Sequence, residues 1–153
     1  MSKFVFKLQP VLDQRERDER DHQLVVAQLE SERLALESRI RMCQQMMDDE
    51  RSTLSQALAP GQQVDLKAVK MQAGASLTHN FEAQRTVLEL AGVFRKLQSA
   101  REALVQAAAK RKAVELLRDQ QKEAFKQEQD RREAQDLDEM SVMRAHRTDG
   151  IRI

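Results

Sequence analysis

Two long series of apolar residues, with spacings built from steps of three and four, constrain this chain more than any other feature. Such steps keep the apolar side chains on one side of an α-helix, as in the heptad pattern of coiled coils. The first series comprises Leu8, Leu12, Val26, Leu29, Leu36, Ile40, Cys43, Met47 and Leu54. The second comprises Ala83, Leu90, Val93, Leu97, Ala100, Leu104, Ala107 and Val114. Each series predicts one long helix with a single narrow apolar seam.

The strongest interruption between the two series is Ala59-Pro60-Gly61. Proline cannot continue a helix, and glycine readily takes the left-handed conformation that ends one. Pro10 fits the first turn of a helix, where its missing N–H costs nothing. We therefore expect a single coiled-coil domain over residues 1–153, with a helix at about 8–58, a break and short helix at 59–75, a helix at about 77–143 and a flexible tail at 144–153.

Both seams become polar at the end that lies far from the break. Residues 15–23 read RERDERDHQ and contain no apolar side chain, although the register continues through this stretch. The register positions in the first polar stretch are Arg15, Glu19 and His22, and those in the second are Arg111, Arg118, Gln121 and Glu128. Such matched lapses favour two helices that fold back on each other.

The resulting prediction is an all-α protein, a two-helix antiparallel coiled coil that is monomeric in dilute solution. A hairpin turning near Pro60 is expected to place residues 15–23 beside residues 118–130. It is also expected to bring two small apolar groups together as a terminal clasp. These groups are Phe4, Phe6 and Leu8 at one end of the chain and Leu137, Met140 and Met143 at the other.

Composition excludes several classes of protein. A chain that is 33% charged, with five Phe and no Trp or Tyr, does not supply the several apolar layers of a globular core. A net charge of +1 gives no general attraction for nucleic acid. No apolar run approaches the ~20 residues that span a bilayer, and the first residues do not resemble a signal peptide. The single cysteine, Cys43, cannot form an internal disulfide. We therefore expect a cytoplasmic protein without direct membrane insertion.

Catalytic and metal-binding signals are also missing from the sequence. The three histidines, His22, His79 and His146, are far apart and lack a second cysteine or a helical His/Glu pair, so a metal site is not expected. No Gly-rich phosphate loop or Ser/His/Asp set occurs. A two-helix hairpin offers no concave site that excludes water. We expect neither an enzyme nor a cofactor, and we expect Cys43 to pack in the seam.

The stretch RERDERDHQ has two interpretations. In the first, it forms a solvent-exposed helix with ion pairs along its surface, such as Asp13 with Arg17 and Glu16 with Arg20, each contributing only ~0.2–0.5 kcal/mol. Alternatively, a polar partner grips this part of the hairpin from outside. Periodicity alone does not choose between these interpretations.

Three segments of the chain resemble the flagellar export protein FliJ family. They are KFVFKLQPVLDQRERDE, RKAVELLRDQQKEAF and DRREAQDLDEMSVMRAHR. The resemblance covers nearly the whole chain, and its most distinctive patterns are F-x-F-x-L-Q-x-V-L-D-x-R-E and E-x-x-x-L-D-E-M. It implies a non-enzymatic stalk of the flagellar type III export apparatus, similar to the shaft of a rotary ATPase. A stalk of a virulence-type secretion system and a purely structural spacer are the alternatives.

The resemblance also implies partners. The terminal half of the coil would insert into the hexameric export ATPase, and the end near the turn would face the cytoplasmic domain of the membrane export gate. Export chaperones are a further implied class of partner, whereas nucleic acid is not. The implied location is the cytoplasm at the flagellar base, peripherally associated with the inner membrane.

Candidate contacts follow from this arrangement. A shaft must engage six ring subunits in turn, and salt-screened polar contacts are weak enough to exchange. The candidates for ATPase binding are the basic residues Arg15, Arg17, Arg20, Arg118, Lys122, Lys126, Arg131 and Arg132. The candidates for gate binding are the apolar residues Leu66, Val69, Met71 and Leu77 near the break. The alternative role of this second set is to cover the end of the seam.

Overall fold

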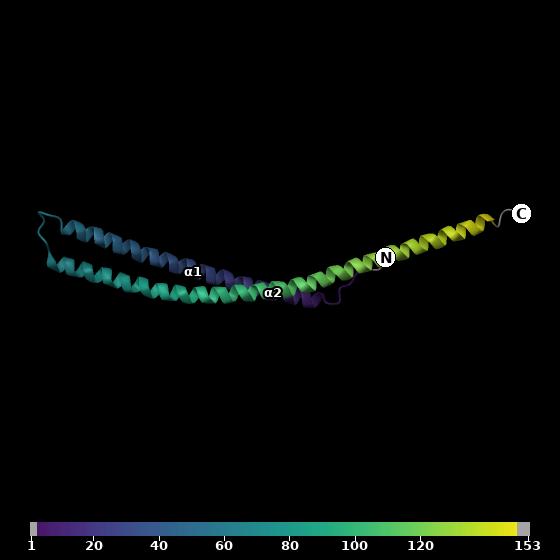
Figure 1. Ribbon diagram of the computed structural model, residues 1–153, viewed down its shortest axis with the longest axis horizontal. Helices are drawn as coiled ribbons and strands as arrows, with labels where there is room; N and C mark the ends of the chain where they lie inside the picture. The colour runs from purple at the N-terminus through teal and green to yellow at the C-terminus, as the bar shows by residue number, and fades with distance from the viewer. Residues whose placement is uncertain (1–2, 150–153) are drawn as a thin grey trace. The chain divides into compact units, whose positions relative to one another are not determined.

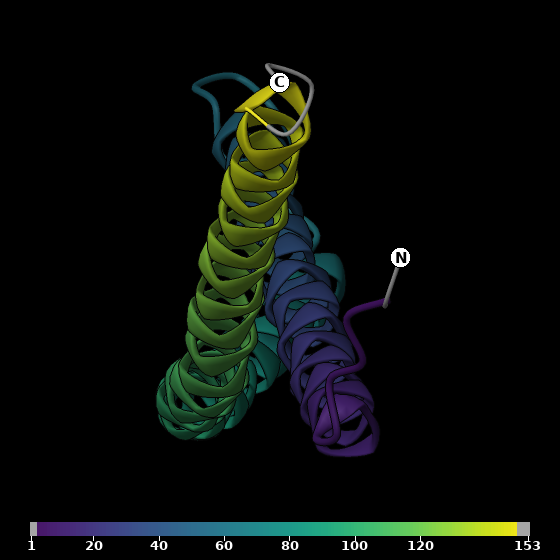
Figure 2. The same cartoon turned by 90° about the vertical axis from the view of Figure 1, so that its right-hand side faces the viewer.

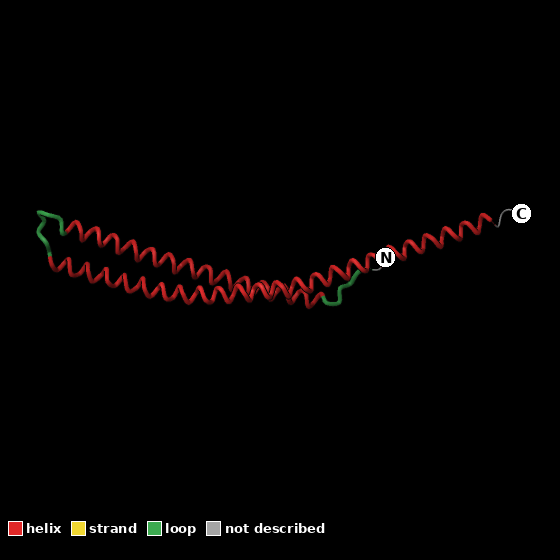
Figure 3. Tube along the Cα trace, in the orientation of Figure 1, coloured by secondary structure: helices red, strands yellow, loops and turns green. Residues whose placement is uncertain are grey.

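The chain forms two long helices in the computed structural model, which describes residues 3–149 and the side chains of residues 3–145. Helix α1 spans Gln9–Ala57 (49 residues) and helix α2 spans Leu66–Asp149 (84 residues). No strand occurs within residues 3–149, and the segment that joins the helices is a loop (Figure 3). The predicted all-α class is confirmed.

The helices pack against each other within two compact units. One unit contains residues 20–106, and the other combines the described residues up to 19 with those from 107. Within the first unit, Glu50 lies opposite His79 at 3.4 Å, Arg39 bonds Glu82 at 2.8 Å, and Glu30 pairs with Arg101. Partner numbers rise along α2 as they fall along α1, so the helices are antiparallel. Within residues 20–106 they lie side by side in two perpendicular views (Figures 1 and 2).

The predicted seam is buried between the helices. In the unit of residues 20–106, the most enclosed side chains are Cys43, Thr86, Val93 and Leu97, each at most 4% exposed. Thr86 satisfies its hydroxyl by donating to the backbone oxygen of Glu82 at 2.8 Å. Most other register positions are half-buried, because a two-helix interface leaves each layer open at its edges. The steps of three and four identified this seam correctly.

The start of α2 differs from the prediction of a separate short helix. Asp65 caps the helix: its Oδ1 accepts from the backbone N–H of Lys67 at 2.9 Å. From Leu66 the helix then continues through Gly74 without a break. Glycine costs a helix only ~1 kcal/mol relative to alanine, which packing along the seam offsets. Residues 144–149 of the expected tail are also helical, and residues 150–153 lie outside the described part of the chain.

A glycine-dependent turn ends α1. Gly61 has φ of +89°, a left-handed conformation that other residues adopt only with strain. The backbone N–H of Gln62 donates to the oxygen of Ala59 at 3.3 Å and closes the turn. The predicted break at Ala59-Pro60-Gly61 is therefore confirmed as the place where the chain reverses.

The other unit corrects two sequence predictions. Glu19 lies opposite Arg111, so residues 15–23 do not lie beside residues 118–130. Both helices rise by the same distance per residue, so residues that face each other lie about equally far along the chain from the turn. Residues 118–130 are farther from the turn than residues 15–23. The predicted terminal clasp is also wrong.

Aromatic residues take the place of that clasp. Phe4 packs on Phe125 with ring centroids 5.7 Å apart, and Phe6 is buried. The residues expected to meet this end of the chain are exposed instead: Leu137, Met140 and Met143. The segment before α1 therefore covers α2 near Phe125, more than about three helical turns before those three residues.

Leu97 provides a test of the seam. It is 2% exposed, and replacing it with alanine removes three buried carbon atoms that α1 cannot fully replace. Leu97→Ala should lower the free energy of unfolding by about 2–4 kcal/mol in urea titrations followed by helical dichroism. Leu88→Ala, at an exposed position of the same helix, should change it by less than ~0.5 kcal/mol. Equal effects of the two substitutions would refute the assignment.

Candidate partner-binding surfaces

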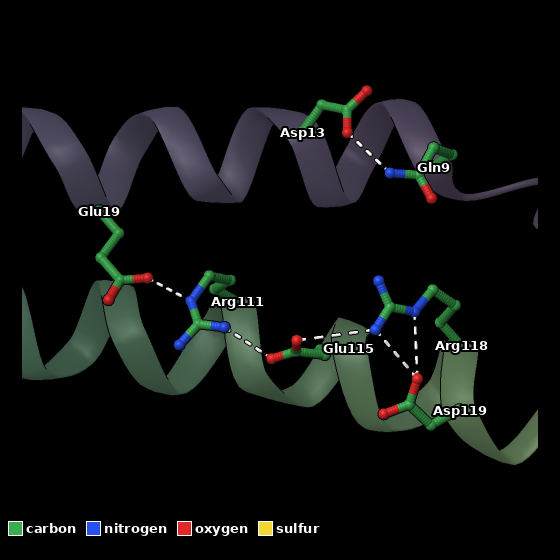
Figure 4. A network of polar contacts seen from close by, with 7 residues as sticks. All are labelled: Gln9, Asp13, Glu19, Arg111, Glu115, Arg118 and Asp119. Carbon is green, nitrogen blue, oxygen red and sulfur yellow. Dashed lines mark hydrogen bonds and ion pairs between the residues drawn. The ribbon is translucent and has the colours of Figure 1, made fainter.

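The polar section of the seam is held by a network of ion pairs. The Arg111 guanidinium donates to Glu19 across the interface and to Glu115 on its own helix at 2.6 Å. Arg118 continues the network, donating to Asp119 at 3.0 Å and lying 3.6 Å from Glu115 (Figure 4). Hydrogen bonding to the Glu19 carboxylate raises the pKa of Arg111 above its ordinary value.

This network explains why both seams become polar in the same unit. The Glu19 side chain is only 14% exposed, and a charge in such a place loses much of its hydration. An opposite charge on the facing helix offsets that loss. Without such a partner, the partly buried carboxylate would be uncompensated. The polar stretch of α1 therefore faces a complementary part of α2. It is neither a fully solvated face nor wholly available to an outside partner.

Several basic residues expected to bind the ATPase have partners within their own helix. Arg15 lies 3.5 Å from Asp18, and Arg118 is part of the network described above. Arg131 and Arg132 both donate to Glu128, at 3.1 and 2.9 Å, and lower the pKa of that carboxyl below its usual value. Outside the Arg118 network, these ion pairs are open to solvent. Each of them therefore contributes little to stability.

The remaining basic candidates have outward side chains. Arg17, Lys122 and Lys126 are exposed and have no ion-pair partner among residues 3–145. Lys122 and Lys126 border an open hollow of about 530 Å³ whose apolar wall is formed by Phe4 and Phe125. This hollow brings two of the predicted residues together. Arg20 is exposed and belongs to the unit of residues 20–106.

The four apolar candidates for gate binding do not form one surface. Leu66, Met71 and Leu77 are exposed, but Val69 is half-buried at a position that continues the seam. Helical geometry places Met71 well away from the side that Leu66 and Leu77 share. The alternative interpretation, in which these residues cover the end of the seam, therefore applies to Val69 alone.

One polar layer in the seam was missed in the sequence. Glu50 and His79 face each other at register positions, and Glu50 Oε2 and His79 Nδ1 are buried without a hydrogen-bond partner. Extending the heptad steps beyond Met47 and backward from Ala83 would have found both residues. Instead, His79 was assessed only as a metal ligand. No cluster suited to a metal ion occurs among the described side chains, and Cys43 is buried as predicted.

One of three comparisons with known proteins found a match for the chain. A family model described as flagellar FliJ protein matches residues 3–150. Neither the search of curated proteins nor that of solved structures found a match. Within residues 3–149, no helix is long and apolar enough to cross a membrane.

The ion pair between the helices at Glu82 predicts a pH dependence. Arg39 donates to Glu82 at 2.8 and 3.2 Å, and this lowers the pKa of Glu82 from its ordinary value of 4.5. Because the folded pKa is the lower one, the stabilising contribution is present above pH 4.5 and is lost as pH falls through the folded value. Glu82→Gln should therefore reduce the loss of stability between neutral and acid pH, measured as urea midpoints.

Arg39→Gln is the matched control for this experiment, because it removes the same pair from the other helix. It should reduce the acid sensitivity to a similar extent, and the double variant should show little further change. An unaltered pH profile in Glu82→Gln would show that the pair does not contribute in solution.

Proposed function

Because the chain belongs to the flagellar FliJ protein family, we propose that it is the non-enzymatic stalk of the flagellar type III export apparatus, linking the export ATPase to the membrane export gate. The observation that supports this role most directly is the state of α2 after residue 129. Every side chain from 130 to 145 is exposed, so no part of α1 covers this stretch. A helix left open on all sides is suited to insertion into a surrounding ring.

The proposed ring contact combines this open stretch with the basic residues nearby. Contacts through outward, unpaired cations are screened by salt and are weak enough to exchange between six subunits. Arg17, Lys122 and Lys126 meet that description best, since none of them has an ion-pair partner among the side chains of residues 3–145. Arg15, Arg20, Arg118, Arg131 and Arg132 complete the proposed set as secondary contacts. Export chaperones are a further proposed class of partner in the cytoplasm at the flagellar base.

ATP hydrolysis by the partner ATPase tests the ring contact. Replacing Arg17, Lys122 and Lys126 together with Gln keeps good helix formers and should leave helical dichroism unchanged. Stimulation of ATP hydrolysis by this variant should be weaker than by the wild type, and the difference should shrink as salt rises.

A matched control variant carries Lys67→Gln, Lys70→Gln and Arg85→Gln, three exposed cations of the other unit. It should stimulate hydrolysis as the wild type does. If the first variant stimulates fully at every ionic strength, the proposed contact residues are incorrect.

The end near the turn is proposed to face the export gate. Leu66, Met71 and Leu77 are the exposed members of the apolar set, and Val69 supports the seam beneath them. Replacing the three exposed residues with Glu should weaken binding to the isolated cytoplasmic domain of the gate, measured by calorimetry, with helical dichroism nearly unchanged. Val69→Glu should instead lower the free energy of unfolding, because it places a charge in the seam. Undiminished binding by the triple variant would show that these three residues do not bind the gate.

A further inference from the structure

The chain before α1 forms a short strap, residues 3–8, which is not helical (Figure 3). Phe4 is half-buried and Phe6 is 7% exposed, whereas Val5 between them is 77% exposed. This alternation is typical of an extended segment, in which successive side chains point to opposite sides. The two phenylalanines therefore point inward, and the Phe4 ring meets Phe125 of α2 with centroids 5.7 Å apart.

The strap contacts a part of α2 that α1 does not reach. Helix α1 begins at Gln9, ten residues before Glu19. Glu19 pairs with Arg111, and ten residues after Arg111 is Gln121. The antiparallel register therefore places the start of α1 opposite Gln121. Phe125 lies about one turn farther along α2, where the strap takes the place of α1 as the neighbour of this helix.

No hydrogen bond or ion pair joins the strap to α2 within the described part of the chain. The backbone bonds of the strap connect it to α1 instead. The N–H of Gln9 donates to the oxygen of Phe6 at 3.1 Å, and the N–H of Leu12 donates to the oxygen of Leu8 at 3.0 Å. The attachment of the strap to α2 therefore depends on apolar contact.

Charge does not hold the strap against α2 either. Lys3 and Lys7 of the strap are exposed, and neither has an ion-pair partner among the described side chains. The hollow beside Phe4 is lined by two basic and two acidic side chains of α2, namely Lys122, Lys126, Asp119 and Glu123. These four charges balance, so they give no net attraction for a basic strap.

The phenylalanine rings leave space between the strap and α2. The open hollow of about 530 Å³ is bordered by Phe4 on the strap and by Phe125 and Gln129 on α2. A segment with few buried apolar side chains, and without backbone hydrogen bonds to its neighbour, opens at a lower free energy than the whole structure. The strap is therefore the part of this unit that separates from α2 most easily.

We propose that the strap is a latch, which opens and closes on α2 while the two helices remain packed. In the closed state it covers the Phe125 ring. In the open state α2 has no neighbour from about residue 122, eight residues before the stretch that begins at residue 130, which is ~12 Å of helix. The latch thereby controls how much of α2 is open to other molecules. This inference concerns the free protein and does not depend on the ring or gate contacts proposed above.

A tryptophan in place of Phe125 reports the state of the latch. The chain contains no Trp and no Tyr, so the fluorescence of a Phe125→Trp variant comes from this position alone. Acrylamide quenches a tryptophan more strongly when its ring is open to solvent. In this background, Phe4→Ser with Phe6→Ser should raise the quenching constant at least about twofold, because the strap no longer covers the ring.

Val5→Ser is the matched control, because Val5 lies between the two phenylalanines and is 77% exposed. It should leave the quenching constant unchanged. An unchanged constant in the Phe4 and Phe6 variant, or an equal rise in the control, would overturn the proposal.

Urea titration of the Phe125→Trp protein tests whether the latch opens independently of the helices. Protection of the tryptophan from acrylamide should be lost at a lower urea concentration than helical dichroism, since local opening costs less free energy than unfolding. Coincident transitions would show that the strap and the helices unfold as one cooperative unit, and would overturn the latch.

Hydrogen exchange of the protein without the tryptophan is an independent measurement. Phe4→Ser with Phe6→Ser should accelerate exchange of the amides in residues 122–129 at least about threefold. Exchange in residues 86–97, which belong to the seam of the other unit, should stay as in the wild type. Equal acceleration in both segments, or none in either, would overturn the proposal.

Discussion

A single narrow seam between two helices is the constraint on which this structure depends. Each layer of such an interface receives about one side chain from each helix and remains open at its edges, so few side chains are fully enclosed. Among the described residues, the buried ones are Phe6, Leu12, Cys43, Thr86, Val93, Leu97 and Ala107. With so thin a core, each layer matters, and polar layers must be matched between the helices.

The polar layers have a role that apolar layers do not provide. Glu19 with Arg111 and Glu50 with His79 are favourable only when the correct residues face each other. A seam of Leu and Ala alone would tolerate a slip of one heptad at small cost. A half-buried ion pair such as Glu19 with Arg111 contributes little net stability, but a slipped register would leave its charges uncompensated. The layers therefore specify the alignment of the helices, and the outward faces remain available to partners.

Sequence reasoning identified the seam because its signal is local and repeated. Cys43, Val93 and Leu97 followed from spacing alone, and Pro10 and Gly61 marked a helix start and a turn. The register between the helices was predicted wrongly, because it depends on where the turn begins and ends, which spacing within one helix does not reveal. The short helix expected to end by residue 75 instead runs on into α2 through Gly74, since the intrinsic cost of one glycine is smaller than the gain from packing along a continuous seam.

The candidate sites were less predictable than the fold. Sequence alone shows that Arg118 and Arg131 are basic, but not that Asp119 and Glu128 occupy their charges. Which side chains pair with one another is visible only in the coordinates.

The short loop after α1 explains why so thin an interface is sufficient to hold the two helices together. Residues 58–65 tether the two helices, with Gly61 reversing the chain and Asp65 starting α2. A short tether holds its two ends at an effective concentration on the order of millimolar. Two separate helices at micromolar concentration would have to gain the difference, about 4 kcal/mol for a thousandfold dilution, from additional contacts. Because the tether supplies that advantage, the interface can remain sparse and most of each helix surface can serve other molecules.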